Sequence, residues 1–497
     1  MPAKHAKRAA GHRSMTAAKA AELQGAPEFL IQSLKDAKVF APRDSQVSTL
    51  TTPAEPWEAR LETGKHLRGA VPREQHSGWK PAPNRPDPTA LILASNAGRE
   101  EDLIPLRMER MAASPFSFLR GAAVVMAWDL AQTPSMGLNV VIDGDCHVNN
   151  FGLFGTPHDD IVIDLNDFDE TMIAPWEWDV KRLTASVNLA GRDNGFSKSE
   201  RRRAVLSCVE GYRTGLSQLK SLGVLELWNR TTMPERMQRP VKADSKSIAV
   251  VRKAVRKARE SNNAMLLKSI TERHSDGRRR LRLDPPVTTA VSNGLKVKII
   301  EALHDYIATL SPERQYMLRR YYVVDVVRRV VGVGSVGLRA YLILLTGNGE
   351  DDALFLQMKE AGVPAHAPYL PILPEAYKHE GQRVVYGQRL LQAAGDPLLG
   401  WTSMDGRPFY VRQMKNMKGA IPTEWLSGDP FNFFVWGYGL LLARAHARGG
   451  DAAVISGYCG KSSILDEAFA DWAEAYGDQT EADHAAFVTQ TQPAQRE

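Results

Sequence analysis

Runs of β-branched, aromatic and other apolar residues in the second half of the chain predict a group of β-strands. Residues 321–331 are rich in β-branched and aromatic side chains, and residues 338–345 form a second apolar run. This run ends in the turn residues 346–349, Thr-Gly-Asn-Gly, after which a third strand is expected over 353–359. A further strand is predicted over residues 409–414. The pattern therefore favours a β-rich segment late in the chain.

The third of these strands places its side chains on two distinct faces. Successive residues of a strand point to opposite sides of the sheet. One face would carry Leu354, Leu356 and Met358, and the other Phe355, Gln357 and Lys359. Lys359 is therefore expected opposite the apolar packing, on a face that a phosphate group can approach.

Helical periodicity dominates the rest of the chain. Ser114 is a suitable N-cap residue, with Pro115 at the first helical position, for a helix reaching about Gln132. Residues 198–310 are predicted to be mostly helical, and the proline-rich residues 26–100 an irregular segment with short helices. Further helices are expected over residues 175–189, 380–394, 430–448 and 462–486.

Length and composition indicate an ordinary globular protein. The chain has 497 residues, which suggests about three domains at most. Its three cysteines are far apart in sequence and predict neither a disulfide framework nor a zinc site. We find no secretory signal and no apolar stretch long enough to cross a membrane. A cytoplasmic protein is the expectation.

The net charge of +6 is unevenly distributed. Residues 1–20 contain five basic residues and no acidic residue, and residues 252–282 contain eleven basic and three acidic residues. The remainder is mildly acidic, so the high isoelectric point does not indicate a basic nucleic-acid-binding body. Residues 1–25 are expected to form a disordered tail. Nucleic-acid binding through this tail stays open but is not favoured.

A glycine-rich loop connects the first two predicted strands. It reads Gly332-Val333-Gly334-Ser335-Val336-Gly337. A dinucleotide-binding fingerprint would require a helix after such a loop, whereas a strand is expected here. Strand, glycine loop, strand, turn and a strand ending in lysine is the order in a kinase nucleotide lobe. Gly332, Gly334, Ser335, Gly337 and Lys359 are therefore candidate nucleotide-binding residues.

The stretch from Asp143 to Glu170 carries the candidate chemistry. Asp145 is followed five residues later by Asn150, which is the spacing of a kinase catalytic loop. An Asp-Phe-Asp turn, residues 167–169, follows a short apolar run. Phosphoryl transfer requires a carboxylate at the nucleophile and oxygen ligands around a cation that bridges the phosphates. The cluster therefore predicts a phosphotransferase that uses ATP and Mg²⁺.

Two sets of neighbouring residues are expected to support this loop. Asp179, early in the helix that follows, is expected to accept backbone N–H groups and hold the shape of the catalytic loop; attraction to the helix dipole explains an acid there equally well. Arg107, Arg110 and Arg120 precede the loop and are candidates for phosphate contacts. Structural ion pairing is the alternative for each arginine.

The motifs occur in an unusual order. Kinases place the glycine loop and lysine before the catalytic loop, whereas here the catalytic loop comes first. A circular permutation reconciles the two orders, because the termini of domains often lie close together.

The chain resembles the bacterial domain of unknown function 2252 (DUF2252) family, grouped with protein-kinase-like and aminoglycoside-phosphotransferase-like folds. The resemblance covers roughly residues 60–485. It is carried by the segments RMERM (107–111), SPFSFLRGAA (114–123), GDCHVNNFG (144–152), NDFDET (166–171), PWEWDVKRL (175–183), VVGVGSVG (330–337), LFLQMKEA (354–361), RVVYGQRLLQ (383–392) and YVRQMKNMKG (410–419).

This resemblance implies an α+β, two-lobed, kinase-like fold that is circularly permuted. The lobes are expected as a disordered basic tail (1–25), a mostly helical catalytic lobe (26–310), a β-rich nucleotide-binding lobe (311–425) and C-terminal helices packed on the catalytic lobe (426–497).

Similarity of GDCHVNNFG to the GDxHxxN loop of aminoglycoside and choline kinases implies the roles of its residues. Asp145 is the implied catalytic base, and Asn150 and Asp167 are the implied magnesium ligands. His147 would brace the loop rather than react.

Departures from the kinase pattern affect the nucleotide site. Arg339 stands where a valine is expected after the glycine loop, and Gln357 where kinases carry a small residue beside adenine. Glu380 and Glu375 are the candidate acidic partners of Lys359.

Three functions remain open from the sequence. The first is an ATP- and Mg²⁺-dependent phosphotransferase acting on a hydroxyl group of a small molecule or protein. The second is AMP transfer by a nucleotide bound in a flipped pose, which Gln357 motivates. The third is a non-catalytic scaffold that binds nucleotide or nucleic acid.

Overall fold

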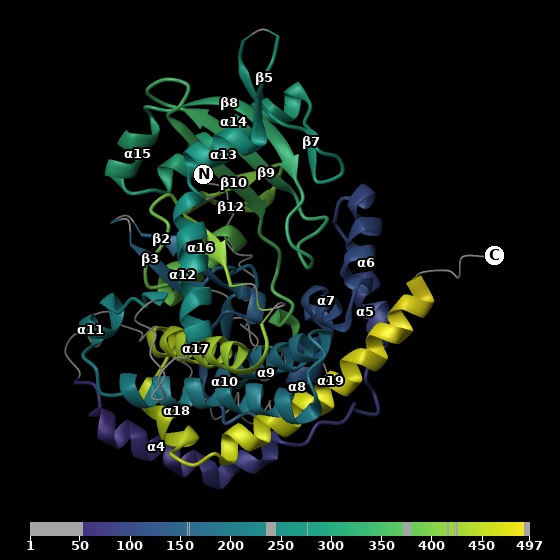
Figure 1. Cartoon of the computed structure of the whole chain (residues 1–497), viewed down its shortest axis with the longest axis vertical. Coiled ribbons are helices and arrows are strands. Elements are labelled where there is room, and N and C mark those ends of the chain that lie inside the picture. The colour runs from purple at the N-terminus through teal and green to yellow at the C-terminus, as the bar shows by residue number, and fades with distance from the viewer. Residues whose placement is uncertain are drawn as a thin grey trace, which may run out of the picture.

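The computed structural model describes residues 53–491, apart from 157, 159, 235–244, 276, 371–378, 415–416, 422 and 424–425. The tail expected over residues 1–25 lies outside the described residues. Helices and strands are mixed, which confirms the predicted α+β class. Figure 1 shows a sheet and its helices at one end of the molecule and a larger helical assembly at the other. We call them the sheet lobe (263–360 and 400–413) and the helical lobe (53–234 and 419–491).

The sheet lobe is built on one antiparallel sheet. Its strand order is β11-β12-β10-β9-β8-β7. The members are β7 (Thr288–Ala290), β8 (Tyr322–Arg329), β9 (Ala340–Thr346), β10 (Ala353–Glu360), β11 (Gly400–Met404) and β12 (Arg407–Gln413). A separate hairpin pairs β5 (Thr271–Arg273) with β6 (Arg279–Leu281). The four strands predicted from the sequence are confirmed as β8, β9, β10 and β12.

Both faces of this sheet are covered, so its central strands are apolar on both sides. Helices α14 (Asn293–Ala308) and α15 (Pro312–Leu318) share one hydrophobic cluster with Leu354, Leu356 and Met358. Helix α13 (Asn263–Ile270) shares a second cluster with Phe355 on the other face. The predicted alternation along β10 is therefore confirmed for its apolar residues.

The helical lobe draws on both halves of the described chain. Its helices are α4 (Trp57–Ala70), α5 (Pro88–Ala94), α6 (Ile104–Ala112), α7 (Pro115–Gly121), α8 (Ala123–Ala131), α9 (Trp176–Asp193), α10 (Lys198–Leu219), α11 (Val224–Asn229), α17 (Gly428–Gly449), α18 (Ala452–Cys459) and α19 (Ile464–Thr491). Short 3-10 turns lie at Arg73–His76, Glu101–Leu103, Val148–Asn150 and, between the lobes, Ala367–Tyr369. Two small antiparallel sheets join β1 (Asn139–Ile142) with β4 (Met172–Pro175), and β2 (Phe151–Gly155) with β3 (Ile161–Leu165) and β13 (Gly419–Ala420).

Helices α10 and α17 pack closely at glycine residues. A Cβ atom on Gly211 would lie 2.0 Å from the carbonyl oxygen of Trp436, and one on Gly439 would lie 2.0 Å from that of Cys208. The two backbones therefore touch directly, which holds α17 in the middle of the helical lobe.

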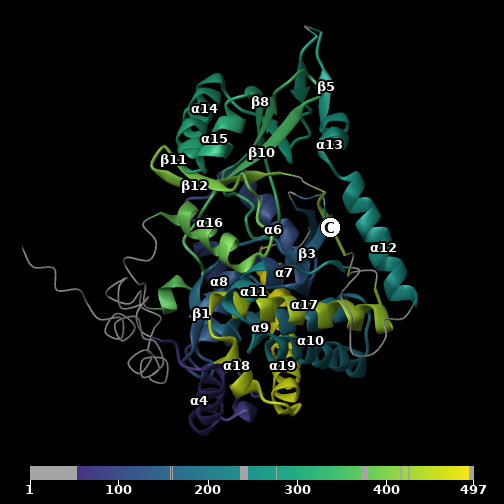
Figure 2. The same ribbon diagram turned by 90° about the vertical axis from the view of Figure 1, so that its left-hand side faces the viewer.

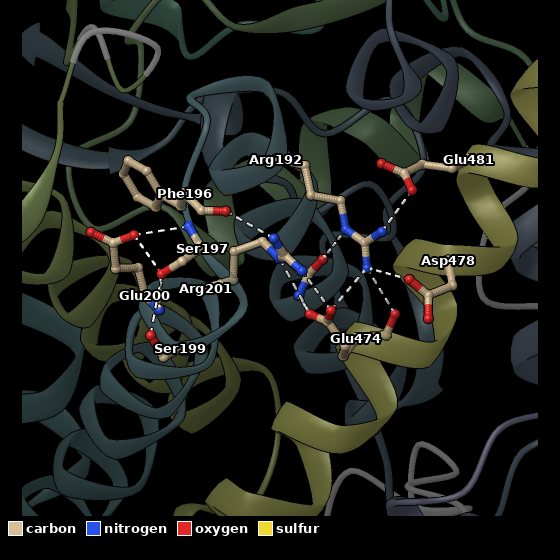
Figure 3. Close-up of polar contacts among 10 residues, drawn as sticks. Arg192, Phe196, Ser197, Ser199, Glu200, Arg201, Glu474, Asp478 and Glu481 are labelled. Atoms are coloured by element: carbon tan, nitrogen blue, oxygen red, sulfur yellow. Dashed lines mark hydrogen bonds and ion pairs between the residues drawn. The ribbon is translucent and has the colours of Figure 1, made fainter.

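Hydrogen bonds and ion pairs hold helix α19 against α9 and α10, as Figure 3 shows. Glu474 accepts hydrogen bonds from Asn188 (2.7 Å) and Arg201 (2.6 Å). Arg192 also reaches Asp478 and Glu481, each at 2.7 Å. Helix α10 begins beside this network with a capping box between Ser197 and Glu200.

Two further helices lie between the lobes. Helix α12 (Ser245–Glu260) runs alongside β2 and β13, and α16 (Glu380–Leu391) packs near β11 and β12 (Figure 2). The helix predicted over residues 380–394 is thus confirmed, three residues shorter than expected.

One expectation is corrected. The single helix predicted from Pro115 to about Gln132 is two helices, because Ala122, at φ −104° and ψ 38°, leaves the helical conformation between α7 and α8. Ser114 does cap α7, its hydroxyl accepting the N–H of Ser117 (3.2 Å). Residues 198–310 are mostly helical, as predicted, and they also contain the short strands β5, β6 and β7, of which β7 extends the large sheet.

Candidate functional site

The catalytic-loop stretch leaves strand β1 and is shaped by α9. Asp179 accepts the backbone N–H of Asp143 (2.7 Å) and of Gly144 (2.9 Å), the contact expected of it. Gly144 has φ +82°, and a Cβ atom there would lie 2.2 Å from the carbonyl oxygen of Glu170. Only glycine fits this position, so the loop is held close to the Asp-Phe-Asp turn.

Asp145 is held by a buried arginine that the sequence reasoning missed. Arg182, from α9, donates its Nε to Asp145 Oδ1 (2.6 Å) and also forms an ion pair with it. Burial raises the pKa of Asp145, although Arg182 opposes the rise. Arg182 lies one turn after Asp179 in α9. Most of this helix is buried on all sides, so its sequence has no polar and apolar periodicity that would have singled out Arg182.

His147 lies beside Asp145 but not at hydrogen-bond distance from it. Its Nε2 lies 3.8 Å from Asp145 Oδ2. Burial, helped by Arg120 and Arg182, lowers the pKa of His147 well below its ordinary value, so the ring is neutral near pH 7. A neutral ring beside Asp145 is consistent with the bracing role implied by the resemblance.

Asn150 and Asp167 are brought together by the backbone. The N–H of Asn166 donates to the carbonyl of Asn150 (3.0 Å), and the side-chain amide of Asn150 donates to the carbonyl of Asp145 (2.7 Å). The Oδ1 atom of Asp167 is buried, and no hydrogen-bond partner for it occurs among the described residues. A carboxylate oxygen and an amide oxygen are thus available on adjoining segments.

Lys359 is bound by the Asp-Phe-Asp turn itself. Its ammonium group forms an ion pair with Asp169 and lies 3.8 Å from Asp167 Oδ1. Burial alone would lower the pKa of Lys359, but these carboxylates raise it. Asp169 also accepts a hydrogen bond from Tyr410 (2.7 Å). Lys359 therefore joins the sheet lobe to the helical lobe.

Glu380, one of the two acids expected to partner Lys359, has a different ion-pair partner. Glu380 forms its ion pair with Arg383 (2.5 Å), and Glu375 lies outside the described residues. The alternation along β10 correctly separated Lys359 from the apolar face, but its partner comes from a turn distant in sequence.

The face of β10 that carries Gln357 is occupied by an arginine. Arg412, on β12, donates to Gln357 Oε1 (3.1 Å) and to the carbonyl of Asn166 (3.2 Å). Its guanidinium group also lies over the ring of Tyr410. Gln357 and Arg412 thus fill space between the sheet and the Asp-Phe-Asp turn.

The glycine loop is attached to the helical lobe by two arginines. Arg99 donates to the carbonyl of Val336 (2.5 Å), and Arg110 donates to that of Gly332 (2.7 Å). Gly332 and Gly337 have φ values of +70° and +90°. These left-handed conformations explain the glycines there and give the loop its tight path.

A single cleft of about 510 Å³ brings most of the predicted residues together. Its walls include Asp145, His147, Asn150, Asp167, Gly332, Gly334 and Ser335. Gly337 and Lys359 are not among the lining residues. Gly337 faces the side chain of Arg99, and Lys359 forms its ion pair with Asp169, which does line the cleft. Asp169 and Glu170 also line the cleft, and so do Arg99, Arg107 and Arg120.

The available donors suit a hard cation that keeps other oxygen ligands. Among the described residues, no cluster of three or more His, Cys, Asp or Glu side chains is arranged to hold a metal. Magnesium usually takes one or two carboxylates and completes its shell with water and phosphate oxygens. Asp167 with Asn150 fits that pattern of few protein ligands.

A second hollow lies across the catalytic loop from the cleft. It measures about 850 Å³ and is lined by Asn149 and Asn166, by apolar residues of β2, and by Lys253 and Lys257 of α12. Arg252 and Arg256 instead border a shallower surface on another side of α12. The basic residues of this helix therefore do not form one surface.

Comparison with known proteins places the chain in one family. The model of a family described as "Uncharacterized protein conserved in bacteria (DUF2252)" matches residues 99–490. No curated protein and no solved structure gives a significant match. Within the described part of the chain, no helix has the length and apolar character needed to traverse a bilayer.

Proposed function

The chain belongs to the DUF2252 family of bacterial proteins, and we propose that it is an ATP- and Mg²⁺-dependent phosphotransferase with a circularly permuted, kinase-like fold. One observation carries the proposal. Asp145, Asn150 and Asp167 share a cleft with Gly332, Gly334 and Ser335, although the two groups lie far apart in sequence. A carboxylate, two cation-binding oxygens and a glycine loop are the parts that phosphoryl transfer requires.

Asp145 is the proposed base. The hydroxyl oxygen of the acceptor bonds to the γ-phosphorus of ATP, the bridging oxygen leaves with its electron pair on ADP, and Asp145 receives the hydroxyl proton. Arg182 fixes the carboxylate, and Asp179 fixes the backbone that carries it. Burial raises the pKa of Asp145, which favours proton acceptance.

Asn150 and Asp167 are the proposed magnesium ligands. Bound Mg²⁺ would screen the negative charge of the phosphate oxygens. The buried Oδ1 of Asp167, which has no hydrogen-bond partner among the described residues, supports this assignment, because a buried oxygen without a hydrogen bond is costly. Asn150 uses its amide nitrogen for Asp145, which leaves its oxygen for the cation.

Transfer of AMP is the second candidate. Arg412 and Gln357 occupy the space beside β10 where a kinase holds adenine, so the base would have to lie elsewhere in the cleft. A reversed nucleotide presents its α-phosphate to the acceptor instead. Mass spectrometry of the product separates the two reactions, because one adds a phosphoryl group and the other adenylate.

The decisive variant is Asp145→Asn. We expect turnover of an ATP-dependent reaction, found by an untargeted metabolite screen, to fall about 10²–10⁴-fold. The melting temperature and nucleotide affinity should stay near those of the unmodified protein, because the amide retains the shape of the side chain. Unfolding would make Asp145 a structural residue, and full activity would refute its role as the base.

Asp167→Ala tests the cation site. In the unmodified protein, Mg²⁺ should tighten ATP binding, as measured by isothermal titration calorimetry. The variant should bind ATP equally with and without Mg²⁺, since the carboxylate ligand is gone. A persistent Mg²⁺ effect in the variant would show that the ion is held by other residues.

A further inference from the structure

The second hollow, of about 850 Å³, lies between helix α12 and the small sheet of β2, β3 and β13. Near its C-terminal end the helix touches this sheet, because a Cβ atom on Gly419 would lie 3.0 Å from the Cβ atom of Ala258. Earlier in the helix, Val250 and Ala254 line the hollow instead. Contact at one end of the helix therefore leaves a space beside its preceding turns.

The side of α12 that borders the hollow combines apolar and basic residues. Residues three or four positions apart in a helix lie on the same face. The lining residues from this stretch follow that spacing and are Val250, Lys253, Ala254, Lys257 and Ser261. Ala254 is buried and Val250 half-buried, whereas Lys253 and Lys257 are exposed. The face thus joins an apolar wall to two ammonium groups that water reaches.

The wall formed by β2 is apolar and well packed. Phe151, Leu153 and Phe154 line it, and all three are buried. Phe151 stacks on Tyr438 of α17, with ring centroids 4.4 Å apart. Surface of this kind suits the ring or chain of a small organic molecule, and sites for such ligands usually measure about 300–1,000 Å³. The size and the lining of the hollow are therefore those of a ligand site.

The charge around the hollow is positive. Its described lining residues include Lys253, Lys257 and Lys418, and none of them is an aspartate or glutamate. Within the part of the chain that the structure describes, neither Lys253 nor Lys257 forms an ion pair with a carboxylate. A ligand with an acidic group therefore complements this site, whereas a cationic one would be repelled.

From this combination we propose that the hollow binds a small organic anion, with its ring or chain against β2 and its acidic group at Lys253 and Lys257. An ammonium group is a compact charge that attracts a carboxylate, sulfonate or phosphate. Asn149 and Asn166 also line the hollow, and each directly precedes a proposed magnesium ligand. The ligand would therefore lie behind the catalytic loop, in a site separate from the cleft.

The probe is the dye anilinonaphthalene sulfonate, which has an aromatic body and one sulfonate and fluoresces in apolar surroundings. The full chain should bind it, as measured by fluorescence titration at about 0.15 M salt. Lys253→Glu combined with Lys257→Glu should weaken binding at least about tenfold, because attraction to the sulfonate becomes repulsion.

Arg252→Glu combined with Arg256→Glu is the matched control. It makes the same change in charge at the same spacing on the same helix, but these arginines border a different surface. Salt screens charges at that distance from the hollow, so the affinity should stay within about threefold of the unmodified protein.

A neutral dye separates the apolar part of the site from the basic part. Phenylnaphthylamine has the same aromatic body without the sulfonate, so the paired lysine variant should bind it within about threefold of the unmodified protein. Val250→Asn, which places an amide in the apolar wall, should weaken the binding of both dyes at least about threefold. Circular dichroism establishes that each variant is folded.

Three results would overturn the proposal. The first is a folded, unmodified chain that binds neither dye. The second is unchanged affinity for the sulfonate dye in the folded lysine variant. The third is an equal loss in the lysine and arginine variants, since the effect would then come from the charge of the whole helix.

Competition with ATP and Mg²⁺ identifies the source of the anion. Complete displacement of the sulfonate dye assigns the hollow to the nucleotide, and simultaneous binding assigns it to a separate organic anion; both results support the site. Neither result depends on phosphoryl transfer. If no such transfer is found while the dye still binds through the lysines, the proposed function fails and the anion site stands.

Discussion

The carboxylate of Glu170, which lines the cleft, is held by a backbone N–H group rather than by a basic side chain. Asp145 has Arg182, and Asp169 has Lys359, whereas Glu170 accepts the backbone N–H of Ala365 (2.6 Å). Burial raises the pKa of Glu170 to about 7. Near neutral pH this side chain is therefore half protonated, and its charge changes within the physiological range.

This raised pKa predicts a pH-dependent stability. Between pH 4.5 and about 7 the unfolded chain has released the proton of Glu170 while the folded chain retains it, so the free energy of unfolding falls as pH rises. Glu170→Gln should remove this dependence, worth up to about 3 kcal/mol, because it cannot ionise. Urea unfolding from pH 4.5 to 7.5 measures it. An identical pH profile for the variant would show that Glu170 titrates normally.

Local spacing was sufficient to predict which residues of the catalytic-loop stretch would lie together. Asp145, Asn150 and Asp167 were found in this way, and they do share a cleft. Arg182 as the partner of Asp145, and Asp169 as the partner of Lys359, were not found. Such contacts join residues from different elements, and neither periodicity nor composition records which distant residue completes a pair.

At the scale of elements, helices α10 and α17 pack with their backbones in direct contact. The carbonyl of Trp436 would lie 2.0 Å from a Cβ atom on Gly211. Backbone atoms of two helices cannot move apart locally, because each helix is rigid and buried on several sides.

Gly211→Ala is therefore expected to lower the free energy of unfolding by about 3 kcal/mol or more, through overpacking. Gly294→Ala is the matched control, since Gly294 also lies in a helix but a Cβ atom there meets nothing within 4 Å. It should leave stability unchanged or raise it by up to about 1 kcal/mol. Chemical denaturation compares the two. Equal stability of both variants would exclude the close helix contact.

Elements with a clear period were the predictable part of the fold. Strands β8, β9 and β10 combine β-branched residues with a defined turn, so their positions follow from sequence. The three-residue strand β7 gives too short a pattern, and it forms by pairing with β8. The break at Ala122 directly follows Gly121, a poor helix former that the prediction did not use, while Ala122 itself is a strong helix former.

At the scale of the whole molecule, the two lobes are joined around the cleft itself. Lys359 connects β10 to the Asp-Phe-Asp turn, and Arg383 of α16 donates to the carbonyls of Thr171 (2.5 Å), Asp169 (2.9 Å) and Gly362 (2.8 Å). Arg99 and Arg110 add contacts from the helical lobe to the glycine loop. The bonds that shape the site are thus also the bonds that hold the lobes together.

The contact between α10 and α17 also means that α10 is synthesised long before the helix it packs against. A ribosome completes α10 roughly 200 residues before it completes α17, which at about 5–20 residues per second is on the order of 10–40 seconds. Throughout that interval the side of α10 that α17 covers in the finished protein, around Cys208, Gly211 and Gly215, lacks that cover. Surface exposed in this way favours aggregation, so we expect a chaperone or the ribosome surface to shield the nascent chain until α17 emerges.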